Sequence, residues 1–163
     1  MIEILVDDDV ATSDVVLASA ADMQRAIMQS CQHIAREQAW DMPASEPEVC
    51  VRLASDAVVS ELNATWRDKP QVTDVLSFPM QEGAVQWDES LGDMILAFPF
   101  VQREAERLGH PPEAHQLHLL VHSTLHLLGY DHINDDEASR MQTLECQIMQ
   151  QLNLHHPYPD IAR

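Results

Sequence analysis

Three histidines within eleven residues constrain this chain more than any other feature of its sequence. They stand at positions 122, 126 and 132, and Gly129 lies between the second and the third. Positions i and i+4 of an α-helix lie on the same face one turn apart, so His122 and His126 can direct their imidazoles at one point. Gly129 can adopt the left-handed conformation that ends a helix, after which His132 can approach the same point. The pattern predicts a helix, a sharp turn and a metal site with three histidine ligands.

Three imidazole ligands favour zinc. A catalytic zinc site typically has three protein ligands and leaves the fourth position for water or substrate, whereas a structural site is closed by four. We therefore expect one Zn²⁺ ion in an open site. Copper and nickel also bind imidazole, and the spacing does not choose among these metals.

The spacing His-x3-His-x2-Gly-x2-His equals that of the metzincin peptidases, but Ser123 stands where those enzymes carry a glutamate. In the peptidases this glutamate is the general base, a role that a serine hydroxyl cannot take near neutral pH. We expect Ser123 to bond back to the carbonyl of Leu119 or to contact the attacking water. The sequence thus predicts a zincin-like metal helix without the peptidase machinery.

Hydrophobic periodicity predicts a single α+β domain over residues 1–163, in which a mixed sheet of about four strands packs with about five helices. Strands are expected at Ile2–Val6, Glu48–Leu53, Val72–Pro79 and Asp93–Ala97. Pro79 predicts that the third strand lies at an edge of the sheet or ends there. Helices are expected within Asp14–Trp40, from Ser55 to about Thr65, and at Phe100–Leu108, Pro111–Leu128 and Asp135–Gln151.

The net charge of -18 works against RNA binding, because 27 acidic residues face eight arginines and one lysine. The Debye length is only about 8 Å in physiological salt, so a local basic group can still act inside a cleft. Three cysteines without a Cys-x-x-Cys pair predict free thiols in a reducing compartment. No apolar run reaches the roughly 18 residues that a membrane span requires, so we expect a cytoplasmic protein without membrane association.

Three blocks of this sequence, residues 121–132, 62–79 and 91–95, together resemble the bacterial YbeY family of single-domain, metal-dependent endoribonucleases. The first block, Val121 to His132, carries Ser123 in place of the family's usual glycine. The second, residues 62–79, is similar to Leu-Asn-x-x-Tyr-Arg-x-Lys-Asp-x-Pro-Thr-Asp-Val-Leu-Ser-Phe-Pro, with Trp66 at the tyrosine. The third, Leu91-Gly92-Asp93-Met94-Ile95, is similar to Leu-Gly-Asp-Ile-x-Ile. The blocks follow the family's order, which makes the resemblance specific.

The resemblance implies a single-strand-specific endoribonuclease of rRNA maturation, acting in late 16S rRNA 3′ end processing and in ribosome quality control. It also implies ribosomal RNA and the small ribosomal subunit as partners. Arg67 aligns with the family's functional arginine, and its guanidinium suits bidentate binding of a phosphate in a catalytic role. Lys69 either touches a neighbouring phosphate or is solvated.

Two other functions remain open on the sequence. One is a metal-dependent hydrolase of peptide or ester bonds, which the metzincin-like spacing favours and Ser123 disfavours. The other is a non-catalytic ribosome-assembly or RNA-binding factor with a structural zinc, which would be closed by a fourth protein ligand.

Side chains near the histidines and the second block have less specific interpretations. His118 is expected to support a ligand or to pack, and His115 to lie on the surface. Asp131 either holds an imidazole N–H or caps the turn. Trp66 and Phe78 are expected to pack in the core rather than to stack on unpaired bases.

Overall fold

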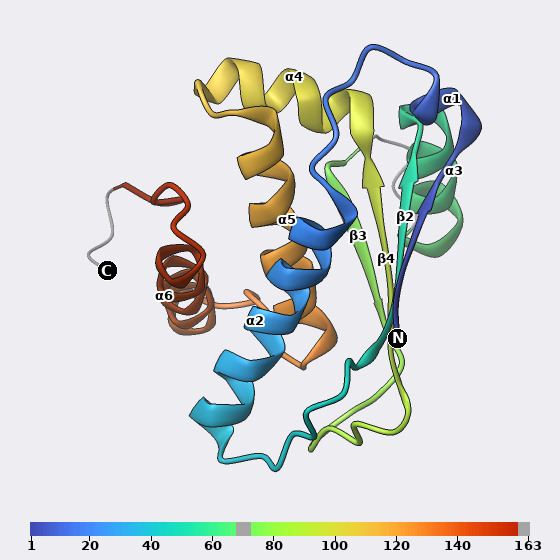
Figure 1. Cartoon of the computed structure of the whole chain (residues 1–163). Coiled ribbons are helices and arrows are strands. Elements are labelled where there is room, and N and C mark those ends of the chain that lie inside the picture. The colour runs from blue at the N-terminus through green and yellow to red at the C-terminus, as the bar shows by residue number, and fades with distance from the viewer. Residues whose placement is uncertain (68–72, 160–163) are drawn as a thin grey trace.

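The computed structural model describes residues 1–67 and 73–159, which form one α+β unit of the predicted class (Figure 1). Its strands are β1 (Ile2–Val6), β2 (Glu48–Ala54), β3 (Val75–Pro79) and β4 (Ser90–Ala97). Its helices are α1 (Asp8–Ala11), α2 (Ala20–Gln38), α3 (Asp56–Arg67), α4 (Phe98–Leu108), α5 (Pro112–Leu127) and α6 (Asp135–Gln151).

The four strands form one mixed sheet in the order β1-β2-β4-β3. β1, β2 and β4 run parallel, and β3 pairs antiparallel with β4 at the edge. Pro79 pairs with Gly92 in that edge strand, where its missing N–H costs no ladder hydrogen bond. The prediction that Pro79 marks an edge strand is therefore confirmed.

Alternate residues of the central strand β4 serve two apolar layers, as the pleat of a strand requires. Met94 and Leu96 belong to the main core, whereas Ile95 packs against the smaller cluster that contains Ala54 and Val59. Helices α2 and α5 lie on one side of the sheet, with α6 beyond them, and α3 lies on the other side (Figure 1).

Helix α5 is enclosed by the sheet, α2, α4 and α6, all of which contact it. Eleven of its sixteen residues are buried, from His115 near its start to Leu127 at its end. A helix covered on all sides has few ways to shift. The side chains that α5 presents are therefore held by the core of the protein.

Most predicted elements are present, and the differences fall at their ends. The helix predicted within Asp14–Trp40 begins at Ala20, because the Ser19 hydroxyl accepts the N–H of Asp22 and caps it there. Ser55 caps α3 as predicted, accepting the N–H of Val58. The short helix α1 was not predicted. None of the helices in the described residues combines the length and apolar character that crossing a bilayer would require.

Gly92 allows β3 and α5 to approach each other closely. Its φ of +135° is disfavoured for residues with a side chain, and a Cβ there would collide with the carbonyl oxygen of Phe78. It would also lie 3.1 Å from the Cδ2 atom of Leu127 on α5. Glycine is thus required at this point of β4, beside the sheet edge that faces the histidine helix.

Candidate metal centre

The three predicted ligands come together at the end of α5. The Nε2 atoms of His122 and His126 lie 3.1 Å apart. The ring of His132 lies with its centroid 5.8 Å from that of His122 and 5.2 Å from that of His126. One ligand atom from each residue lies within 4.8 Å of the others, so the three side chains could hold one metal ion.

The turn that delivers His132 is built as the sequence predicts. Gly129 has a φ of +100°, and the N–H of Tyr130 reaches back to the carbonyl of Leu125 at 3.0 Å. Asp131 accepts the backbone N–H of His132 at 2.8 Å, so of the two interpretations of Asp131 the structure supports the cap of the turn.

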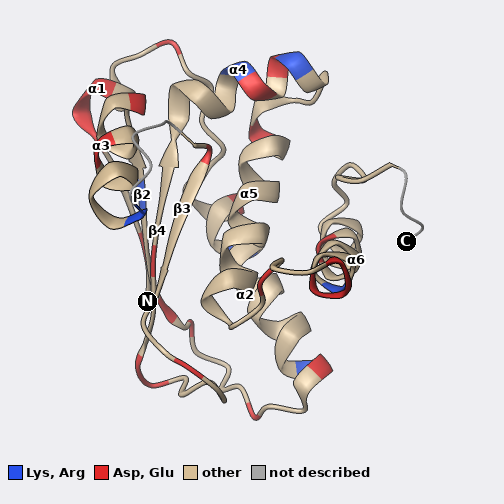
Figure 2. Cartoon of the chain, turned by 180° about the vertical axis from the view of Figure 1, so that it is seen from behind, with Lys and Arg blue, Asp and Glu red and all other residues tan. Residues whose placement is uncertain are grey.

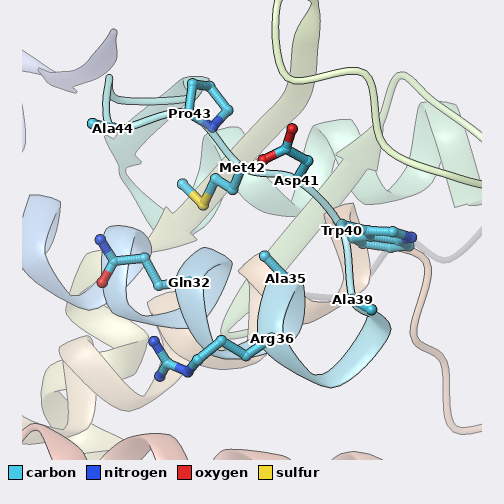
Figure 3. Close-up of a pocket in the computed structure, with 9 residues that line it drawn as sticks. All are labelled: Gln32, Ala35, Arg36, Ala39, Trp40, Asp41, Met42, Pro43 and Ala44. Carbon is cyan, nitrogen blue, oxygen red and sulfur yellow. The ribbon is translucent and has the colours of Figure 1, made fainter.

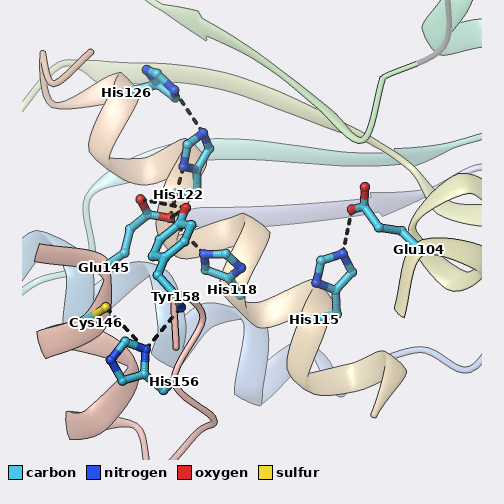
Figure 4. A network of polar contacts seen from close by, with 9 residues as sticks. All are labelled: Glu104, His115, His118, His122, His126, Glu145, Cys146, His156 and Tyr158. Carbon is cyan, nitrogen blue, oxygen red and sulfur yellow. Dashed lines mark hydrogen bonds and ion pairs between the residues drawn. The ribbon is translucent and has the colours of Figure 1, made fainter. Parts of the chain in front are cut away.

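The hydrogen bonds of the first two rings determine where their protons lie. Nδ1 of His122 lies 3.0 Å from the Glu145 carboxylate (Figure 4). Nδ1 of His126 lies 3.0 Å from the Tyr130 carbonyl. Carbonyl and ionised carboxylate oxygens only accept, so both Nδ1 atoms must carry hydrogen. When both rings are neutral, both Nε2 atoms therefore present lone pairs to one another across 3.1 Å.

Two facing lone pairs repel unless a cation lies between them. Two nitrogens at about 2.0–2.1 Å from a tetrahedral zinc ion would be about 3.3 Å apart, close to the observed separation. The donor set and its tautomers thus fit a metal bound by His122, His126 and His132.

Burial and neighbouring charges adjust the protonation of the cluster. Burial, together with the neighbouring His122 and His132, lowers the pKa of His126 to about 4. Burial also acts to lower the pKa of His122, but the hydrogen bond and charge of Glu145 outweigh it and raise that pKa. Burial would raise the pKa of Glu145, yet the bonds from His118 and His122 hold it at about 2. Glu145 is therefore ionised near neutral pH.

A cleft of about 970 Å³ opens beside the three histidines. It is lined by the end of α5 and the turn after it, by α3, and by β3 with its flanking segments; these residues are Asn63, Arg67, Thr73–Ser77, Pro79–Gly83, His122, His126 and Gly129–His132. Arg67 thus shares the cleft with the three histidines. Its Nη2 donates to the carbonyl of Ser77 at 2.9 Å.

Ser123 links α5 to the wall that carries Arg67. Its hydroxyl is fully buried and lies 2.7 Å from the hydroxyl of Ser77. Neither expectation for Ser123, a bond to the Leu119 carbonyl or contact with water in the cleft, describes this arrangement. The pairing was beyond sequence reasoning because the two serines are 46 positions apart.

Several side chains lie elsewhere than predicted. His115 is buried, not on the surface, since it bonds Glu104 of α4 at 2.6 Å (Figure 4). Trp66 is 69% exposed, so the prediction of core packing is wrong for it, whereas Phe78 does pack against the smaller core. Lys69 lies outside the described residues.

Sequence reasoning missed Glu145. It is the acid on the buried face of α6, among apolar side chains that recur at helical spacing, namely Met141, Leu144, Ile148 and Met149. A charged residue in such a stripe is rarely buried without a partner, and this was the available signal. His118, which was expected to support a ligand or to pack, bonds the same carboxylate at 2.8 Å.

A second hollow, of about 740 Å³, lies at the C-terminal end of α2 and the loop that follows (Figure 3). Trp40 and Met42 give it an apolar side, and Arg36 and Asp41 are its charged residues. It contains no cluster of metal-binding side chains among the residues described, so we assign the chemistry to the histidine cleft.

Several known proteins are similar to this chain. The family model "Endoribonuclease YbeY" matches residues 9–153. The chain is 41% identical over 140 residues to the Endoribonuclease YbeY of Rhizobium meliloti, covering 84% of this chain and 83% of that protein. It is 41% identical over 152 residues to that of Sinorhizobium medicae, covering 91% and 84%.

A solved structure has the same fold. The solution structure of a Thermotoga maritima protein aligns with a TM-score of 0.55 at 22% identity and covers 94% of this chain and 92% of that one. An α+β domain in which a buried helix and the turn after it offer three histidines to a cleft defines a class of candidate metal-dependent hydrolases. Within that class, the chain belongs to the YbeY family of endoribonucleases.

Proposed function

We propose that this protein is a single-strand-specific, zinc-dependent endoribonuclease that matures ribosomal RNA, at the late 3′ end processing of 16S rRNA and in ribosome quality control. Its partners would be ribosomal RNA and the small ribosomal subunit, which would place it in the cytoplasm. Family membership supports the nuclease activity. One observation carries the proposal: three convergent histidines and Arg67 line the same cleft.

Hydrolysis of a phosphodiester requires an activated water and positive charge beside the phosphoryl oxygens. His122, His126 and His132 would hold the zinc, whose chemistry is a water of pKa about 7 and a charge that polarises the phosphoryl group. Arg67 would orient the phosphate, because within residues 1–67 and 73–159 one of its donors is used by the Ser77 carbonyl and the others remain for oxygens of the substrate.

The cleft is acidic, so a bound metal would also supply the positive charge that RNA binding requires. Acidic residues lie over much of the molecule, including α1 and the first turn of α6 (Figure 2). The charged residues among the described lining of the cleft are Arg67, Asp74, Glu82 and Asp131. One cation among three acids repels RNA, so we expect phosphate to bind in the cleft only when zinc adds its charge.

The two alternative functions, a peptide or ester hydrolase and a non-catalytic factor with a structural zinc, fit the same residues less well. A peptidase needs a general base beside the metal, but the Ser123 hydroxyl is buried against Ser77. Glu145 is also buried and is already bonded to His122. A purely structural zinc would be enclosed by four protein ligands, whereas this histidine group borders a cleft.

Mapping cleavage of ribosomal precursor RNA tests the proposal. Zinc-loaded protein should create new RNA ends that His122→Ala does not create, and Arg107→Ala, which loses a charge on α4 away from the cleft, should cut like wild type. New ends that are identical with wild type and His122→Ala would contradict it. RNA binding without any new ends would favour the non-catalytic assembly factor instead.

A further inference from the structure

Glu145 is a completely buried acid next to a proposed metal ligand. Its residue exposure is 0%, and its neighbours Leu144 and Cys146 on α6 are equally buried. Removing an ionised carboxylate from water costs several kcal/mol unless hydrogen bonds and opposite charge compensate. The chain therefore maintains a costly group at this point, 23 residues away in sequence from the histidine that it contacts.

Hydrogen-bond donors surround this carboxylate (Figure 4). Its Oε1 accepts from Nε2 of His118 at 2.8 Å and from Nδ1 of His122 at 3.0 Å. The hydroxyl of Tyr158, in the segment after α6, lies 3.1 Å from Oε1 and 3.2 Å from Oε2. The carboxylate is thus fixed from α5 on one side and from the C-terminal segment on the other.

The bond to His122 has a direct consequence for metal binding. A carboxylate that accepts from Nδ1 keeps the proton on that nitrogen, leaves Nε2 unprotonated and makes it a stronger ligand. We propose that Glu145 is the positioning residue of the metal centre: it holds His122 as the tautomer that binds zinc, and His118 and Tyr158 hold Glu145.

A second pair, between a histidine of α5 and a carboxylate of a neighbouring helix, provides a control. Glu104 bonds Nε2 of the buried His115, and His115 lies outside the three-histidine group. Glu104→Gln and Glu145→Gln each remove one negative charge, and they weaken one and two charged hydrogen bonds to histidines of α5, respectively. Only Glu145→Gln changes the partner of a proposed ligand.

Zinc affinity, measured by competition with a chromophoric chelator, tests this role. Glu145→Gln should bind zinc about 10- to 100-fold more weakly than wild type, the usual effect of losing such a partner. Glu104→Gln should bind like wild type. Tyr158→Phe should also stay within a few-fold, because it disturbs the same buried network and leaves both imidazole bonds in place.

The position of the ring proton of His122 can be measured in the wild-type protein, so this test does not depend on the folding of a variant. Long-range ¹H–¹⁵N NMR of the zinc-free wild type, at a pH where the ring is neutral, should show hydrogen on Nδ1. The inference would be overturned by hydrogen on Nε2, by equal zinc affinity in wild type and Glu145→Gln, or by an equally large loss in Glu104→Gln.

This inference rests on the proposed function only through the three histidines. A protein that binds zinc through His122 and cuts no RNA would overturn the nuclease proposal while leaving the role of Glu145 standing. If the protein cuts RNA but wild type and Glu145→Gln bind zinc equally, the role of Glu145 would be overturned and the nuclease proposal would stand.

Discussion

The two walls of the cleft are held in place by different means. On the histidine wall, His122 and His126 project from an enclosed helix, and the Nδ1 atom of each donates a hydrogen bond to an oxygen of the protein. On the opposite wall, Arg67 is the exposed last residue of α3, and among the described residues one hydrogen bond, to the carbonyl of Ser77, holds its guanidinium. The comparison indicates a rigid metal holder facing an arginine that can adjust to its substrate, and it predicts different consequences of substitutions on the two walls.

The largest effect is expected on the rigid wall. His126→Ala removes one of three ligands, so stoichiometric zinc should be lost, as elemental analysis after dialysis would measure. His110→Ala, a histidine outside the three-histidine group, should keep its zinc. Retention of one zinc ion by His126→Ala would remove this residue from the ligand set.

The adjustable wall should affect the reaction without affecting the metal. Arg67→Ala should slow RNA cleavage by about 10²-fold, comparable to the loss of one electrostatic donor in other enzymes. Its zinc content should equal that of wild type. Arg107→Ala, with the same loss of charge, controls for the overall change. Wild-type turnover in Arg67→Ala would show that the two walls do not act together.

Acid should weaken the rigid wall through Glu145. The pKa of its carboxyl is about 2 in the folded protein and about 4.3 in an unfolded chain, so the unfolded chain takes up the proton first. Its contribution to stability is present above about pH 4.3 and is lost as the pH falls toward 2. Between pH 6 and pH 3 the zinc-free protein should lose about 2 kcal/mol that Glu145→Gln does not lose, as urea unfolding would measure. Identical pH profiles would contradict this.

The smallest effect is expected where the two walls meet. Ser123→Ala leaves the buried Ser77 hydroxyl without its partner, which should cost about 1–2 kcal/mol of unfolding free energy. Cleavage should slow by only about three-fold, because the Ser77 carbonyl still holds Arg67. Ser139→Ala, on the exposed face of α6, is the control. In a double-mutant cycle with Ser77→Ala, additive losses would show that the hydroxyls do not interact.

The difference between local and long-range contacts explains which features of the molecule could be predicted from the sequence. The histidine pattern is local, since helix geometry and one glycine bring His122, His126 and His132 together, and Pro79 identified the edge strand for an equally local reason. The misses are long-range: Glu145 reaches His122 from another helix, and Glu104 buries His115. Such pairings depend on how elements pack, and no periodicity along one segment encodes them.

Gly92 has a consequence for the width of the cleft. A larger residue there would meet Phe78 of β3 and Leu127 of α5 at once, and would force the edge strand away from the helix. Ser77 would move with that strand, and the anchoring oxygen of Arg67 would move with Ser77. A position outside the lining of the cleft thereby sets the width of the cleft.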